Sequence, residues 1–242
     1  GTCNTPDRAF GLAVSGNHAY VADFTSGVRE INISDPTHPY ETGWYDTPGY
    51  AEGVTVSGDY IYVADSQEGL HILSSNLSYL GTYDTPGSAL KVAVSGPFAY
   101  VADHDEGLRI VNVSDPENPY ETGHFTSWGV AYNVAVSGCY AYVAYGHSGL
   151  CIVDISNPNN PVRVGNTSVS TGNGIDVAGQ YAYFTRGDAG VYIYNVSDPS
   201  NPIEVGHFDT PGSANFIDVI GNYAFVTERE FGLHILDISN PA

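Results

Sequence analysis

One short phrase recurs six times along this chain, and its recurrence constrains the fold more than any other feature of the sequence. The phrase reads VSGNHAYVAD at 14–23 and VSGPFAYVAD at 94–103. The glycines of the six copies are separated by 42, 38, 42, 41 and 42 residues: Gly16, Gly58, Gly96, Gly138, Gly179 and Gly221. Periods of this length are typical of β-propellers and solenoids.

Each repeat predicts four short β-strands. An apolar run such as 89–96 ends at a Ser-Gly turn, and the AYVAD segment that follows alternates in the manner of a strand. A turn ending in glycine leads to a third strand such as 108–114, and a D-P-x-N-P turn leads to a fourth such as 119–125. No amphipathic helix and no linker interrupts the series.

Residues 1–242 are therefore predicted to form one all-β domain, a six-bladed β-propeller with four antiparallel strands per blade. A β-solenoid is the alternative, but a repeat of about 40 residues with four turn signals is long for one solenoid coil.

The two ends of the chain hold complementary parts of a repeat. Residues 1–7 (GTCNTPD) align with the end of a fourth strand and the loop after it, as in TYDTPGSA at 82–89, while the last repeat, 214–239, supplies only three strands. We therefore expect residues 1–7 to complete blade 6 and close the ring, which removes an exposed sheet edge. The same strand supplied by a neighbouring molecule would instead link propellers head to tail.

The third strands and the turns that follow them carry a family resemblance. The segments GLRIVNVSDPENP at 107–119, GLCIVDISNPNNP at 149–161 and GVYIYNVSDPSNP at 190–202 resemble the LVIVD repeat. The second repeat departs from the pattern, because 69–81 lacks the D-P-x-x-P turn. The resemblance covers essentially the whole chain. It implies a β-propeller from a bacterial or archaeal surface or secreted protein, with no general catalytic activity.

The charge balance excludes one class of partner. The chain has 27 acidic and 7 basic residues, a formal net charge of −20, and a phosphate backbone would repel it, so nucleic-acid binding is excluded. Charged residues make up only 14%, so the surface must be rich in Tyr, Ser, Thr, Asn and Gly. Such a surface suits an extracellular or cell-surface protein that self-associates or carries glycans. No apolar run approaches the roughly 18 residues of a membrane span.

Acidic residues follow the second strand of several repeats. These loops and the D-T-P-G loops are predicted to share one face and to make it acidic, so that a cation or a cationic partner would dock there. The residues of this acidic face are Asp23, Asp65, Asp103, Asp105 and Glu106. The alternative is structural: an Asp at this point opens a turn by bonding backbone N–H groups.

Two carboxylates occupy unusual positions on innermost strands. Asp176 and Asp218 stand where other repeats have Ala or Thr, and their blades are neighbours. Such a pair would hold a hard cation such as Ca²⁺ or raise the pKa of one carboxyl by repulsion. The alternative is two solvated carboxylates, since Ca²⁺ takes six or more oxygen ligands.

Five asparagines stand in N-glycosylation sequons. Three of them share a repeat position with Asp154 and Asp237, where an Asx side chain is expected to cap a turn, and the other two are the better candidates for carrying sugar. The capping group is Asn32, Asn112 and Asn195; the glycan candidates are Asn166 and Asn76.

The three cysteines do not form a disulfide framework. Cys139 and Cys151 are predicted to lie roughly 15 Å apart along one hairpin, beyond disulfide reach. Cys3 is then a candidate for an intermolecular thiol contact.

No catalytic constellation is evident. The eight histidines show no metal-ligand spacing, and His71 and His234 share one position on the third strand, as Arg29 and Arg109 do, which favours packing or surface roles. We therefore expect a non-catalytic extracellular or cell-surface module, glycosylated and self-assembling into a filament or surface layer. One alternative is an adhesion module that binds a surface protein or polysaccharide at the acidic face; another is a Ca²⁺-dependent hydrolase or lyase.

Overall fold

The computed structural model describes residues 1–167 and 172–241. The chain divides into two compact units, Gly1–Thr122 and Gly123–Ala242. The described residues form strands and turns and contain no helix, so none of them belongs to a helix that could span a membrane.

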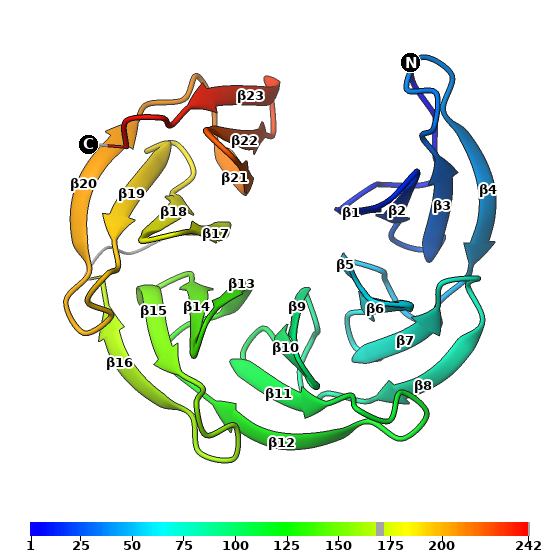
Figure 1. The fold of residues 1–242 in the computed structure, drawn as a ribbon, viewed down its shortest axis with the longest axis horizontal. Helices are drawn as coiled ribbons and strands as arrows, with labels where there is room; N and C mark the ends of the chain where they lie inside the picture. The colour runs from blue at the N-terminus through cyan, green and yellow to red at the C-terminus, as the bar shows by residue number, and fades with distance from the viewer. Residues whose placement is uncertain (168–171, 242) are drawn as a thin grey trace. The chain divides into compact units, whose positions relative to one another are not determined.

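The first unit contains blades 1 to 3, each a sheet whose four strands follow one another in chain order (Figure 1). Blade 1 consists of β1 (Gly11–Ser15), β2 (His18–Ala22), β3 (Val28–Asn32) and β4 (Tyr40–Tyr45). Blade 2 consists of β5 (Gly53–Ser57), β6 (Tyr60–Ala64), β7 (Leu70–Ser74) and β8 (Tyr79–Tyr83). Blade 3 consists of β9 (Lys91–Ser95), β10 (Phe98–Ala102), β11 (Leu108–Asn112) and β12 (Tyr120–Phe125), the last of which includes the boundary between the units.

The second unit contains blades 4 to 6 (Figure 1). Blade 4 consists of β13 (Ala131–Ser137), β14 (Tyr140–Tyr145), β15 (Gly149–Asp154) and β16 (Val162–Asn166). Blade 5 consists of β17 (Ile175–Ala178), β18 (Tyr181–Thr185), β19 (Val191–Asn195) and β20 (Ile203–Phe208). Blade 6 has three strands, β21 (Ala214–Ile220), β22 (Tyr223–Glu228) and β23 (Gly232–Asp237).

The predicted fold class, an all-β six-bladed propeller, is confirmed, with four strands in five blades and three in the last. The Ser-Gly turns explain why glycine recurs in every repeat. Gly96 has a φ of +56°, a left-handed conformation that glycine adopts at little cost. The prediction that residues 1–242 form a single domain stays a prediction.

Consecutive blades within a unit pack face to face through alternating apolar residues. In the first unit, Leu70 and Ile72 of β7 join Val92 and Val101 of blade 3 in one buried cluster. In the second unit, Ile193 of β19 packs with residues of blade 6 in the same way. Strands of consecutive blades therefore bury apolar side chains between them, whereas Leu12 and Val14 of β1 stay exposed.

Residues 1–7 form no strand and lie against blade 1. The Thr5 hydroxyl donates to Asp23 Oδ1 at 2.6 Å, and the Asp7 N–H donates to Asp23 Oδ2 at 3.0 Å. The N-terminal amino group donates to the Pro36 carbonyl at 2.8 Å. This segment therefore occupies, on blade 1, the place of the strand end and loop of a preceding blade. Its predicted pairing with blade 6 stays a prediction.

Candidate functional site

The aspartates that end the second strands of blades 1 to 3 join consecutive repeats instead of forming an acidic face. Asp65 accepts a hydrogen bond from the Thr47 hydroxyl of the preceding D-T-P-G loop (2.6 Å) and another from the Gly49 N–H (2.8 Å). Asp103 makes the same pair of contacts with Thr85 and Gly87.

These aspartates have no exposed surface. Asp23, Asp65 and Asp103 are each 0% exposed, so the structure removes them from the predicted acidic face. The structural alternative is right in that each side chain accepts a backbone N–H, but that N–H belongs to the preceding loop, while backbone groups close the Asp's own turn: the Glu106 N–H donates to the Asp103 carbonyl. The physical reason is the threonine of the preceding loop, whose hydroxyl needs an acceptor when it is buried.

The other two residues of the predicted acidic face remain near the surface. The Asp105 side chain is 77% exposed and lies 3.2 Å from the His104 ring. Glu106 is engaged by Arg109, whose Nη2 donates to Glu106 Oε2 at 2.6 Å. Of the five residues predicted to form the acidic face, only Asp105 and Glu106 therefore remain near the surface.

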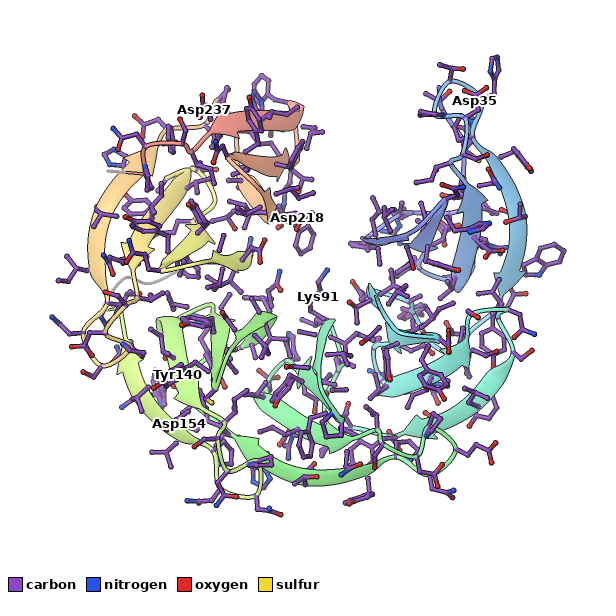
Figure 2. All side chains as sticks on the ribbon, in the orientation of Figure 1. Asp35, Lys91, Tyr140, Asp154, Asp218 and Asp237 are labelled. Atoms are coloured by element: carbon purple, nitrogen blue, oxygen red, sulfur yellow. The ribbon has the colours of Figure 1, made fainter. Side chains whose placement is uncertain are left out.

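Asp176 and Asp218 lie on neighbouring strands of the second unit, and Asp218 projects from β21 (Figure 2). Asp176 accepts hydrogen bonds from the Val219 N–H and the Val177 N–H, both at 2.7 Å. Burial raises the pKa of Asp176 to about 6, and the charge and hydrogen bond of Asp218 add to the rise. Among the described residues, no three His, Cys, Asp or Glu side chains gather as a metal would require.

The sequon asparagines fall into the two predicted groups. The Oδ1 of Asn112 accepts from the N–H and the hydroxyl of Ser114, and Asn32 and Asn195 make the same turn. The equivalent Asp154 and Asp237 cap Ser156 and Ser239, and these hydrogen bonds lower their pKa values (Figure 2). Asn166 and Asn76 are exposed.

The cysteines have different environments, and none is in a disulfide. Cys3 is half-buried against Ala19, Val21 and Ile31 of blade 1. Cys139 is exposed, whereas Cys151 is buried, which raises the pKa of its thiol to about 12.

Among the described residues, no fourth strand pairs with the outer edge of β23. Leu233 and Ile235 of this strand are 57% and 59% exposed, whereas the equivalent Leu108 and Ile110 of β11 are fully buried. The edge therefore presents both apolar side chains and backbone groups that pair with no described strand.

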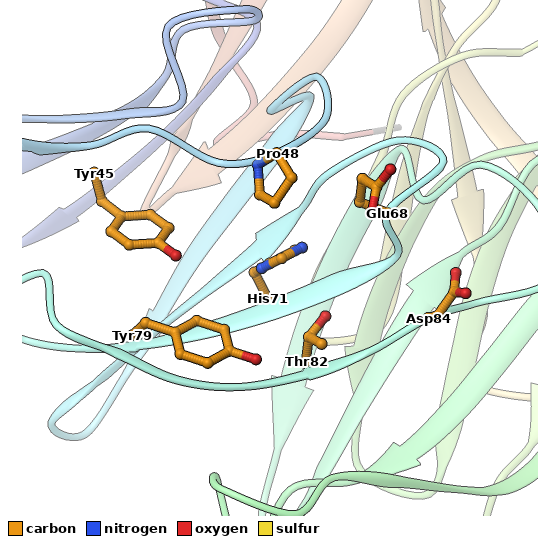
Figure 3. Close-up of a pocket in the computed structure, with 7 residues that line it drawn as sticks. All are labelled: Tyr45, Pro48, Glu68, His71, Tyr79, Thr82 and Asp84. Atoms are coloured by element: carbon orange, nitrogen blue, oxygen red, sulfur yellow. The ribbon is translucent and has the colours of Figure 1, made fainter.

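A pocket of about 350 Å³ opens beside blade 2 in the first unit (Figure 3). The described residues that line it come from β4, β7, β8 and the loops β4–β5, β6–β7 and β8–β9: Tyr45, Pro48, Glu68, His71, Tyr79, Thr82 and Asp84. His71 forms the buried wall, with its side chain 5% exposed, and Asp65 Oδ2 lies 3.5 Å from its Nε2. The rings of Tyr45 and Tyr79 are near-parallel, with centroids 6.5 Å apart. The volume lies in the range of small-ligand pockets.

The polar groups of this pocket are incompletely satisfied. Neither ring nitrogen of His71 has a hydrogen-bond partner among the described residues. Burial lowers the pKa of His71, although Asp65 and Glu68 act in the opposite direction, and burial raises the pKa of Asp65. Burial therefore disfavours the charged ring of His71, and the Glu68 backbone and Asp65 Oδ2 are polar groups that lie beside it.

Sequence reasoning missed this pocket. It placed Arg29, His71 and Arg109 on two shared repeat positions and assigned them packing or surface roles. The structure shows that all three stand at the second residue of the third strand. The available signal was a paired change: where blade 2 has His in place of Arg, it also has Tyr79 in place of the glutamate found as Glu41 and Glu121.

Comparison with protein families gives one match over the whole chain. The LVIVD repeat model matches six consecutive segments, at 8–47, 48–85, 86–127, 128–169, 172–210 and 211–242. No curated protein matches the chain.

Solved structures share the fold at low sequence identity. A functionally unknown protein from Desulfotomaculum acetoxidans DSM 771 is 17% identical with a TM-score of 0.83, covering 98% of this chain and 84% of its own. The computationally designed Ika8 protein has 6% identity and a TM-score of 0.72, with 98% and 73% covered. BamB from Moraxella catarrhalis has 13% identity and a TM-score of 0.68, with 98% and 85% covered. At these identities the likeness shows the fold alone.

Proposed function

This chain belongs to the LVIVD-repeat family, and we propose that it is a non-catalytic extracellular or cell-surface interaction module that self-assembles through the open edge of its last blade. The strand added to β23 is residues 1–7 of a second copy. The observation that carries the proposal is that the two ends of the chain present complementary parts of one blade.

Residues 1–7 support their half of the proposal by the contacts they make on blade 1. Thr5 stands where Thr47 and Thr85 stand, with the same 2.6 Å hydrogen bond to a buried aspartate. Gly1 aligns with Gly81, and an added Cβ at either glycine would collide with the turn before the fourth strand of the following blade. The segment is thus shaped as a fourth strand without a third strand beside it.

The last blade supports the other half. β23 pairs with β22 along one side only, and its exposed Leu233 and Ile235 would be covered by an added strand. Addition of an extended segment at a sheet edge supplies main-chain hydrogen bonds along the strand and buries alternate side chains. Head-to-tail addition of this kind produces rings or open filaments.

The register can be tested by a disulfide. In blades 1 and 2 the first apolar residue of the third strand pairs with a tyrosine of the fourth, as Val28 with Tyr45 and Leu70 with Tyr83. Cys3 takes the tyrosine position and Leu233 the apolar one, so the two should face each other across the added strand. Antiparallel partners lie roughly 4.5–5.5 Å apart between Cα atoms, within disulfide reach.

We expect Leu233→Cys in a Cys139→Ser background to form covalent oligomers under mild oxidation, visible as a ladder without reductant. Ile220→Cys, at 63% exposure on another strand of the same blade, is the matched control and should stay monomeric. A disulfide within a single chain would show that the segment closes its own ring. That result, or no disulfide at all, would overturn assembly by this route.

Glycosylation is part of the same proposal. Asn166 and Asn76 are exposed, whereas Asn32, Asn112 and Asn195 are half-buried. Mass spectrometry of the intact native protein tests glycosylation. A mass equal to that of the unmodified chain would reject the proposal that the protein is glycosylated.

The two alternative functions have less support. Asp23, Asp65 and Asp103 are buried and cannot bind a partner at the acidic loop face. Adhesion there would depend on the carboxylates that remain exposed. No observation on the described residues favours a Ca²⁺-dependent hydrolase or lyase, and we do not propose it.

A further inference from the structure

Two blades of the first unit bury an arginine among acidic side chains. In blade 3, Arg109 lies 2.6 Å from Glu106, 3.6 Å from Asp103 and 3.6 Å from Glu121. Its side chain is 6% exposed, so the carboxylates replace the water that a buried guanidinium has lost.

Blade 1 repeats this arrangement with one acid at the same position, Glu41 for Glu121, and one at a new position, Asp46. Arg29 lies 3.2 Å from Asp46 and 4.0 Å from Glu41, and its guanidinium carbon lies 5.9 Å from the centre of the Trp44 ring. Carboxylates and an aromatic ring are the groups that a guanidinium prefers in proteins.

Blade 2 keeps the acids and lacks the arginine. Asp65 corresponds to Asp103, and Glu68 corresponds to Glu106. Asp84 corresponds to Asp46, the partner of Arg29.

The arginine position itself is held by His71, which is shorter than arginine. The pocket of about 350 Å³ lies in front of its ring (Figure 3). Tyr79 stands where blades 1 and 3 have Glu41 and Glu121, and it adds an aromatic face to the acids that remain.

We propose that the blade 2 pocket binds the guanidinium group of an arginine side chain presented by a protein partner. The carboxylates of Glu68 and Asp84 would pair with the cation, and the rings of Tyr45 and Tyr79 would flank it. A ring nitrogen of His71 accepts one of its N–H groups. The partner's arginine thus fills the place that Arg29 and Arg109 fill in their own blades.

The exposure of the pocket entrance and its negative charge both favour a cationic side chain as the ligand. Glu68, Thr82 and Asp84 are exposed, so a side chain from another molecule can reach the buried His71 wall. An anionic ligand would meet Glu68 and Asp84 at the entrance and be repelled. The binding would operate independently of self-assembly, because no residue of the pocket lies in residues 1–7 or β23.

The test uses the whole chain and two probes of nearly equal shape. We expect Nα-acetyl-arginine N-methylamide to bind and the corresponding citrulline amide, which lacks the positive charge, to bind at least tenfold more weakly, measured by NMR titration. Equal binding of the two probes would overturn the proposal.

Protein variants locate the site. Glu68→Gln should weaken arginine binding at least fivefold, whereas Glu117→Gln, which removes the same charge from an exposed turn of blade 3, should leave it unchanged. His71→Arg should abolish binding by filling the pocket. Equal effects of Glu68→Gln and Glu117→Gln would show only attraction to the net charge and would reject the site. Saturable binding of CaCl₂ that Glu68→Gln removes, without arginine binding, would mean a metal site instead.

Discussion

Blades 3 and 6 are built from the same repeat, yet their third strands have opposite environments. The apolar residues of β11 are buried, whereas β23 exposes Leu233 and Ile235. The difference follows from the neighbours: β11 is covered by β12, whereas no strand of the described part of the chain pairs with the outer side of β23. The repeat sequence therefore specifies that a third strand forms. Whether the apolar side chains of that strand are buried depends on the strand that pairs with its outer edge.

The acidic residue that ends the second strand shows the same contrast. Asp103 of blade 3 is hydrogen-bonded to Thr85 and Gly87 of the preceding loop. Glu228 takes this position in blade 6; its side chain is 0% exposed and neither carboxylate oxygen has a hydrogen-bond partner among the described residues. His234 Nε2 lies 3.4 Å away. Apart from this contact with His234, the Glu228 carboxylate of blade 6 makes no hydrogen bond among the described residues.

The largest effect should come from removing the acid in each blade. Asp103→Ala leaves the buried Thr85 hydroxyl and the Gly87 N–H without their acceptor and removes one of the three carboxylates around Arg109, and should cost about 3 kcal/mol of unfolding free energy. Glu228→Ala removes a buried carboxylate with no hydrogen bond and should be neutral or stabilising. Urea unfolding at pH 7 measures both. A similar loss for the two variants would show that Glu228 has a partner and that the contrast between the blades is false.

The stability of the contact between blades 5 and 6 should depend on pH through Asp176. Burial raises the folded-state pKa of Asp176 to about 6, above its unfolded value of 3.8. The proton is therefore held more tightly in the folded state, so the contribution of Asp176 to stability is fully present below about pH 4 and is lost as the pH rises through about 6.

Asp176→Asn removes the loss of stability that deprotonation of Asp176 causes. Relative to the wild type, the variant should gain up to about 3 kcal/mol of stability between pH 4 and pH 7. Asp188→Asn, at an exposed acid of blade 5, is the control and should show a flat difference. A flat difference for Asp176→Asn as well would contradict a raised pKa.

The sequence predicted the parts of the structure that repeat. The Ser-Gly turns, the alternating second strands and the D-P-x-N-P turns depend on local chemistry, and they placed the blades correctly. The capping roles of Asn112 and Asp154 also follow from short-range geometry and were predicted.

The parts that were missed depend on contacts between repeats. Asp65 was expected on an exposed face, but its partner Thr47 belongs to the preceding blade and buries it. The blade 2 pocket arises because His71 and Tyr79 change together, and their meaning appears only beside the filled site around Arg109.

The central claim is that β23 receives a strand from a second copy, and hydrogen–deuterium exchange of residues 232–237 tests it most directly. The account predicts that outward-facing amides of this segment exchange fast in dilute protein and become protected as the protein concentration rises, while β11 stays protected throughout. Exchange at β23 that is independent of concentration, whether fast or slow, would contradict the account.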